Sequence, residues 1–303
     1  GIDYCESQDS IKKMKARIAQ QFKPETNTLL LQSPAFELLK DSLINTASIV
    51  RQAVYEKRPV LLSHHADADG FCAGFYLEDA ILELVKQTQP HERFPHRSVT
   101  RIPSRTPFYD IIDATKDINH FLAQQKYYGQ KTPLIIIVDN GSTPQDVQSI
   151  QKAKHFGADV VVVDHHDPGP LDDNGQSVIC KEVLEHVNPH LKGLSKEYSA
   201  SILAYVLAPL IYSHKPSVHP AIIGCVADRS TIPELDELIS QTNEKREFYR
   251  ELALFVDYEI HLTKSMSHEI LRELVFGSFE DKKKLIALYA DSFKEEKEHV
   301  ISS

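Results

Sequence analysis

Three nearly continuous apolar runs along the chain predict buried β-strands. They span residues 59–63, 134–138 and 160–163, and the last is four consecutive valines. Short runs of this kind, rich in β-branched and aliphatic residues, are typical of strands buried on both faces, as in a parallel sheet. The segment 97–105 contains Pro103 beside β-branched residues, so we expect a strand and loop there rather than a helix.

Helical patterns alternate with these strands. An apolar stripe at residues 35–57 ends before Pro59, and another helix is expected to begin after Gly70, where glycine permits a tight turn. Three further helical patterns occupy residues 107–125, 144–156 and 196–213. Strands alternating with helices through residue 164 predict an α/β fold with a doubly wound, mainly parallel sheet.

The chain is expected to divide into three parts. Residues 1–57, including a peripheral amphipathic helix at 8–24, form an N-terminal helical segment packed on the core. Residues 58–231 form the α/β domain. Charged helical patterns dominate residues 232–303, which are interpreted as a helical extension or a linker toward a further domain.

Composition narrows the class of protein. The 303 residues carry a formal net charge of −9, and no run approaches the ~18–20 apolar residues that span a bilayer. The N-terminus shows no secretory signal, and its start at Gly1 is consistent with a processed or engineered end or with a fragment. The four cysteines, Cys5, Cys72, Cys180 and Cys225, are scattered along the chain. This suggests reduced thiols and a cytoplasmic protein. The apolar runs predict no membrane segment.

Acidic and imidazole side chains follow each of the three apolar runs. Asp164-His165-His166 follows the valines, His64 through Asp69 follows the first run, and Asp139 follows the second. A single Asp after a strand is usually a turn or helix-cap residue. Ligands of parallel sheets, however, bind outside the carboxyl ends of the strands, where all three groups would meet. The pattern therefore predicts a shared metal site.

The types of donor indicate which metal. Carboxylate oxygens and imidazole nitrogens without thiolates suit Mn²⁺, or alternatively Mg²⁺. Asp67 and Asp69 are two residues apart, so in extended chain one carboxylate can face each of two cations. Two cations ~3.5–4 Å apart need a bridging anion between them. Asp139, which arrives on a separate strand, is the candidate for that bridge.

Four segments together carry a resemblance to a known family. They are His65–Gly70, Ile137–Gly141, the Asp164-His165-His166 triplet and Ile223–Asp228. In this order they resemble the motifs of the DHH phosphoesterase family over roughly residues 58–230. Within that family the chain looks most similar to RecJ-like nucleases of the archaeal type.

The resemblance implies a ligand set for each of two metals. One would be held by His65, Asp67 and Asp139. The other would be held by Asp69, Asp139, His165 and Asp228. The sequence departs from the family at Ser63, where many members have a metal-binding His. His65, or alternatively His64, would have to take that role.

Five further residues are candidates for chemistry or substrate binding. His166 is expected to contact a phosphoryl oxygen or assist a proton transfer, although it could instead serve only to orient Asp164. Asp164 is expected to orient a ligating histidine. Arg229, Arg101 and Arg105 are candidate phosphate-binding residues, with a solvated charged face as the alternative for the latter two.

The resemblance implies a hydrolase acting on phosphoester bonds. The expected activity is that of a RecJ-like exonuclease, which converts single-stranded DNA or RNA to 5′-mononucleotides by two-metal catalysis. Replication or repair proteins are candidate partners. The net charge of −9 and the absence of a recognisable glycine-rich partner domain in 232–303 favour one alternative, a hydrolase of oligoribonucleotides, cyclic dinucleotides or pyrophosphate. A non-catalytic replication scaffold is a second alternative.

Overall fold

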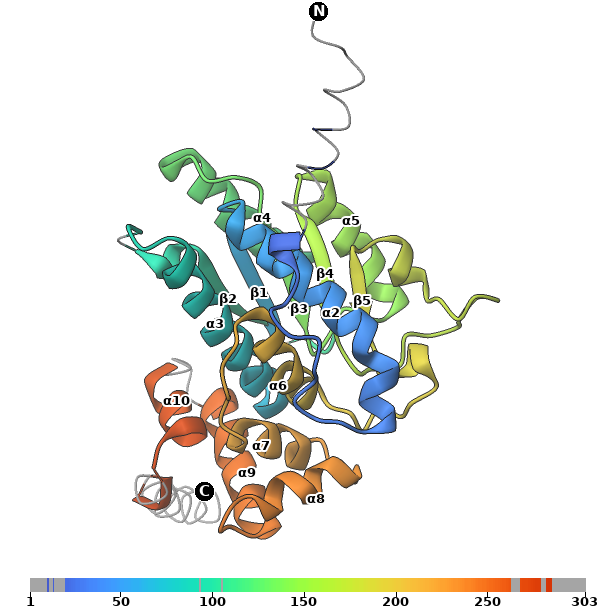
Figure 1. Ribbon diagram of the computed structural model, residues 1–303, viewed down its shortest axis with the longest axis vertical. Coiled ribbons are helices and arrows are strands. Elements are labelled where there is room, and N and C mark those ends of the chain that lie inside the picture. The colour runs from blue at the N-terminus through green and yellow to red at the C-terminus, as the bar shows by residue number, and fades with distance from the viewer. Residues whose placement is uncertain are drawn as a thin grey trace, which may run out of the picture.

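The strands of the molecule form one parallel sheet. A computed structural model describes residues 10, 13, 20–92, 94–104, 106–262, 268–278 and 282–284. In this part of the chain the strands lie in the order β2-β1-β3-β4-β5, and every neighbouring pair is parallel (Figure 1). Their bounds are β1 Val60–His65, β2 Val99–Ser104, β3 Leu134–Val138, β4 Asp159–Val163 and β5 Glu185–Val187.

Helices cover both faces of this sheet, which confirms the expected doubly wound α/β fold. One face is covered by α2 Pro34–Tyr55, α3 Ala68–Thr88 and α6 Ala200–Ile211, and the other by α4 Ile111–Tyr128 and α5 Val147–His155. Four further α-helices of the described chain, drawn in orange and red in Figure 1, gather at one end of the sheet. They are α7 His219–Ala227, α8 Pro233–Ser240, α9 Arg246–Leu262 and α10 His268–Phe276.

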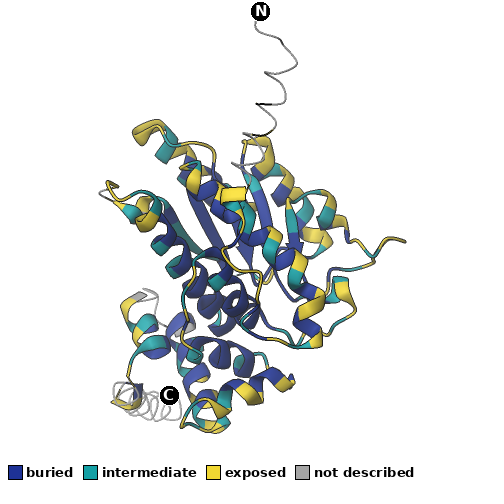
Figure 2. Cartoon of the chain, in the orientation of Figure 1, coloured by how far each residue is buried: buried dark blue, intermediate teal, exposed yellow. Residues whose placement is uncertain are grey.

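Alternation along the strands separates two apolar cores. Leu62 and Ile136 face the layer of α2, α3 and α6, whereas Leu61 and Ile135 face α4 and α5. All four side chains are at most 2% exposed, because helices cover the sheet on both sides. Figure 2 shows the central strands β1, β3 and β4 and the inward faces of the helices as buried, whereas the edge strand β2 is largely of intermediate burial. The apolar runs therefore predict the strands well, since burial on both faces leaves no polar alternation.

Several boundaries differ from the expected ones for local reasons. The helix expected at 107–125 begins at Ile111, because the Asp110 side chain accepts hydrogen bonds from the Ile112 and Asp113 amides and caps it. Strand β5 was not expected, since its three residues carry no apolar run. The amphipathic helix expected at 8–24 lies largely outside the described residues. No helix in the described part of the chain is both long and apolar enough to cross a membrane.

The strand order places a topological switch point between β1 and β3. These strands are neighbours, and the chain leaves β1 through α3 on one face and enters β3 from α4 on the other. Such a divergence opens a crevice at the carboxyl ends of the strands, which is the usual ligand site of open α/β sheets. The first two acidic motifs lie directly after these two strands.

Replacing Ile136 with Ala is expected to lower the free energy of unfolding by about 2–5 kcal/mol, because the side chain is fully buried in the central strand. Leu254 in α9 is 64% exposed and serves as the control, since Leu254→Ala should change stability by less than about 0.5 kcal/mol. Urea denaturation followed by circular dichroism measures both. Equal effects of the two substitutions would contradict this account of the core.

Candidate metal centre

Three adjacent strands bring the acidic and imidazole groups to one level. His65 is the last residue of β1, while Asp139 and Asp164 directly follow β3 and β4. The register pairs His64 with Val138 and Val138 with Val163, so these strand ends lie side by side. Asp228, at the C-terminus of α7, reaches the same place from outside the sheet, with its carboxylate 3.1 Å from His165.

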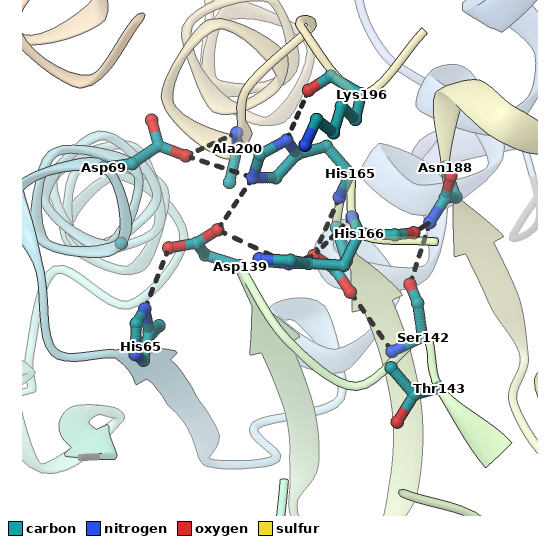
Figure 3. A network of polar contacts seen from close by, with 12 residues as sticks. His65, Asp69, Asp139, Ser142, Thr143, His165, His166, Asn188, Lys196 and Ala200 are labelled. Carbon is teal, nitrogen blue, oxygen red and sulfur yellow. Dashed lines mark hydrogen bonds and ion pairs between the residues drawn. The ribbon is translucent and has the colours of Figure 1, made fainter. Parts of the chain in front are cut away.

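Asp139 lies at the centre of the cluster. Its Oδ2 is 3.7 Å from His65 Nδ1, and its Oδ1 is 3.2 Å from His165 Nε2 (Figure 3). The two carboxylate oxygens therefore face two different groups of donors. The residue adopts a φ of 59°, a left-handed conformation that is uncommon for a non-glycine residue. A carboxylate whose two oxygens face different groups of donors has the arrangement expected of a bridge between two cations.

His165 has its ring fixed by the backbone. Its Nδ1 lies 2.5 Å from the carbonyl oxygen of Lys196, which can only accept a hydrogen bond. Its Nε2 is directed into the cluster, 3.1 Å from Asp228 Oδ2 and 3.9 Å from Asp69 Oδ2. A backbone carbonyl on one nitrogen fixes the tautomer that leaves the other free to ligate a metal.

The paired aspartates of the first motif are held at helix N-termini. Asp67 caps α3 by accepting a hydrogen bond from the Gly70 amide at 2.9 Å. Asp69 is fully buried and accepts from the amides of Ala200 and Ser201, at the start of α6, at 2.7 and 3.0 Å. Free amides and the helix dipole stabilise a carboxylate at such a position.

Gly224 explains how α7 can approach Asp69. A Cβ atom at this position would lie 2.3 Å from Asp69 Oδ1 and 2.2 Å from Ser201 Oγ. Any larger side chain would therefore displace the buried carboxylate. The glycine within the fourth motif is thus a requirement of the site's geometry as well as of helix packing.

Burial and crowding determine the charge of the cluster. Burial, together with the neighbouring Asp67, raises the pKa of Asp139 to about 6. Burial, with the charges of Asp228 and Asp139, raises the pKa of Asp69 well above its ordinary value. Burial would lower the pKa of His65, but the neighbouring carboxylates of Asp139 and Asp67 raise it to about 10. Without a cation, protons must supply the positive charge that these carboxylates require.

These residues fit a hard divalent cation. Among the described residues, the buried Asp139 Oδ2 has no hydrogen-bond partner, although it faces the other donors. An unpaired buried carboxylate oxygen is costly unless a cation or donor meets it. Three groups of side chains in the described chain have ligand atoms within 4.8 Å of one another. They are His65, Asp67 and Asp139; Asp69, His165 and Asp228; and Asp139, Asp164, His165 and His166.

Asp164 organises the loop of the triplet from within. It is fully buried, and its oxygens accept from the Ser142 amide at 3.1 Å, the His165 amide at 2.7 Å and the His166 ring at 2.7 Å. Burial alone would raise the pKa of Asp164, but the hydrogen bond and charge of His166 hold it well below its usual range. The same contact raises the pKa of His166 to about 9 against the effect of burial. The His166 side chain remains 41% exposed, so its ring also faces solvent.

A polar network behind the triplet was not expected from the sequence. Asn188 donates hydrogen bonds to Ser142 Oγ and to the His166 carbonyl, both at 2.9 Å. Buried His186 in β5 lies 2.8 Å from Ser142 Oγ. These residues join the ends of β3, β4 and β5 beneath the site. The pair Asn188-Pro189 is typical of a turn, but it carries no signal of chemistry.

His64 and Arg101 lie in the interior, on the α3 side of β1. Arg101 Nη1 donates to His64 Nε2 at 3.0 Å, so His64 Nδ1 carries the proton and donates to the His65 carbonyl at 2.7 Å. His64 thus has both nitrogens occupied, and the structure places His65 at the cluster instead. The Arg101 side chain is 6% exposed and pairs with Glu78 at 3.3 Å. This burial argues against the expected role of Arg101 in phosphate binding.

The other two candidate arginines have different outcomes. Arg229 is exposed, directly follows Asp228 and has a φ of 58°. Its position at the edge of the cluster is compatible with substrate binding, which stays a prediction. Arg105 lies outside the described residues.

Comparison with known proteins identifies the family. The model of the DHH family, N-terminal domain, matches residues 59–228, which is more than half of the chain. The chain therefore belongs to the DHH family, as the four motifs indicated.

Two curated relatives span much longer chains. An uncharacterized protein of Methanocaldococcus jannaschii, MJ1198, is 33% identical over an alignment of 274 residues that covers 84% of this chain and 36% of its own length. The single-stranded-DNA-specific exonuclease RecJ of Bacillus subtilis is 24% identical over 205 residues, or 66% of this chain and 23% of its own. The chain thus spans about a third or less of these relatives.

Solved structures show the same architecture. The DHH domain of PF0399, described as a member of a family of ribosomal proteins, has a TM-score of 0.87 at 30% identity, covering 98% of this chain and 70% of its own. The exonuclease RecJ bound to manganese has a TM-score of 0.56 at 15% identity, covering 81% and 64%. The second likeness concerns the fold alone.

The contact between His166 and Asp164 predicts a pH-dependent contribution to stability in metal-free protein. Because the pKa of His166 is raised in the folded state to about 9, its stabilisation is full below about pH 6.5 and is lost as pH rises through 9. His166→Ala should therefore lower the free energy of unfolding more at pH 6 than at pH 10. We expect a difference of about 1 kcal/mol, since solvent screens this partly exposed pair.

Denaturation in EDTA at the two pH values measures this difference, with His155→Ala on α5 as a surface control. An equal effect of His166→Ala at both pH values would contradict the ion pair.

Proposed function

We propose that this chain is the catalytic part of a metal-dependent phosphodiesterase, of the RecJ-like exonuclease type, acting on single-stranded DNA or RNA. One observation carries the proposal: Asp139 directs one oxygen toward His65 and the other toward His165, so that two ligand groups share a single carboxylate. Membership of the DHH family and the likeness to RecJ support it.

We further propose that two Mn²⁺ ions, or alternatively Mg²⁺, bind at the cluster. His65, Asp67 and Asp139 would hold one ion, and Asp69, Asp139, His165 and Asp228 the other. Two divalent cations in such a site lower the pKa of a bound water and stabilise both the attacking and the leaving oxygen of a phosphoryl transfer. The RecJ relative bound to manganese supports this choice of ion.

The chain's own residues would position the substrate. His166 has a partly exposed ring whose Nδ1 is fixed by Asp164, so its other nitrogen can hydrogen-bond a phosphoryl oxygen or transfer a proton. Asp164 acts through His166 and through the loop amides that it accepts from, and it is too deeply buried to meet substrate. Arg229, exposed at the rim, is the candidate for a phosphate contact.

A second candidate function is favoured by the surface charge. Arg101 is buried against Glu78, so it cannot contribute to a basic strip, and the chain carries a net charge of −9. A protein that binds long nucleic acid usually presents a basic face. A hydrolase of short oligonucleotides, cyclic dinucleotides or pyrophosphate needs no such face.

Asp139→Ala is expected to reduce kcat by more than about 100-fold, because loss of a direct shared ligand exceeds the ~10–100-fold cost of removing an outer partner. Asp172→Ala, which removes a solvent-exposed carboxylate from a loop, is the matched control and should leave turnover unchanged. Release of nucleotides from labelled oligonucleotide in Mn²⁺ measures both. Full activity of the Asp139 variant with an intact fold would end the two-metal proposal.

The two candidate functions are separated by substrate length. An exonuclease on long strands should cleave a single-stranded 20-mer with a kcat/KM at least as high as that for a dinucleotide, and release 5′-mononucleotides. A small-substrate hydrolase should favour the dinucleotide in kcat/KM by about tenfold or more, which corresponds to ~1.4 kcal/mol of transition-state stabilisation. Chromatography of the products identifies the outcome.

A further inference from the structure

Helix α9 contacts the turn that carries Asp67 and Asp69, although α9 lies outside the segment that the family model matches. The match ends at residue 228, whereas α9 spans Arg246–Leu262. Within α9, the carboxylate of Asp257 accepts a hydrogen bond from the backbone amide of Ala68 at 2.8 Å. Ala68 stands between Asp67 and Asp69 and is the first residue of α3. The contact therefore joins residues 189 positions apart at the first motif.

The position of this amide makes the contact important. The first amides of a helix have no partner within the helix. Asp67 satisfies the Gly70 amide, and Asp257 satisfies that of Ala68. Ala68 is fully buried, so loss of the carboxylate would leave its amide without solvent to replace it. The orientation of this first turn determines where Asp67 and Asp69 direct their oxygens.

Helix α10 contacts α3 farther along that helix and is linked from there to the same motif. Arg272 pairs with Asp79 at 2.8 Å and lies 3.5 Å from Glu78, the carboxylate that also pairs with Arg101. Arg101 in turn holds His64, whose ring donates to the carbonyl of His65. The helices beyond the matched segment therefore contact the start of α3 directly, and they are linked to the end of β1 through Glu78, Arg101 and His64.

We propose that Asp257 is a positioning residue of the metal centre, which fixes the turn that presents Asp67 and Asp69 to the cations. Helix α9 then completes a site that residues 59–228 do not build alone. The inference rests on the proposed function in that it requires divalent cations at this cluster. If the inference holds, binding of the cations depends on Asp257 of α9 as well as on the ligands themselves.

Calorimetric titration of the full chain with Mn²⁺ tests this role without relying on turnover. Asp257→Ala removes the acceptor and should weaken Mn²⁺ binding about 10-fold or more, as loss of partners that orient metal ligands does. Asp257→Asn keeps an oxygen acceptor and should remain within about threefold of the parent. Glu251→Ala removes an exposed carboxylate from the same helix and should bind as the parent does.

Parental Mn²⁺ affinity in Asp257→Ala would overturn the positioning role while leaving the proposed function intact. Equal weakening in the Asn and Ala variants would also overturn it, because charge rather than the hydrogen bond would then be responsible. A parent chain that binds no Mn²⁺ would overturn the proposed function and this inference together.

Amide hydrogen exchange in the metal-free parent gives a second measurement, should Asp257→Ala not fold. The Ala68 amide is expected to be strongly protected by its bond to Asp257. Exchange at the rate of an unstructured amide would overturn the inference.

Discussion

The cost of crowding buried carboxylates at one end of a sheet governs this structure. Asp69, Asp139 and Asp164 are each at most 1% exposed, and like charges so placed repel one another unless opposite charge or hydrogen-bond donors offset them. The molecule offsets them in three ways: the amides at the start of α6 meet Asp69, loop amides meet Asp164, and imidazoles meet Asp139. Asp139 Oδ2 alone among these oxygens has no hydrogen-bond partner in the described chain, and there a cation would contribute most.

The same constraint explains why so many elements converge on the site. A parallel sheet delivers backbone and side chains to the carboxyl ends of its strands, but it cannot by itself supply enough donors. The N-termini of α3 and α6 supply amide donors, the end of α7 brings Asp228, and the carboxylate of Asp257 on α9 accepts from the Ala68 amide. Gly224 permits the close approach of α7 that this convergence requires. The apolar cores on both faces hold these elements in place, so stability and metal geometry depend on the same packing.

Some positively charged side chains hold the fold together, and others stay accessible near the cluster. Arg101, Arg272 and Arg51 are engaged with protein groups, so their charge is used to hold the fold. His166 and Arg229 remain accessible beside the cluster, where under the proposed function they would be free to meet substrate.

The sequence by itself determined four of the five described strands, the parallel sheet and most of the cluster, because burial on both faces and the acid-rich strand ends leave local patterns. It did not determine β5, whose three residues have no such pattern, nor the choice between His64 and His65, which are adjacent but point to different sides of β1. It also suggested substrate binding for Arg101, whose pairing with Glu78 depends on how α3 packs against β2. Only the tertiary structure decided these points and brought Asp257 to Ala68, since contacts between distant segments depend on packing that no local pattern records.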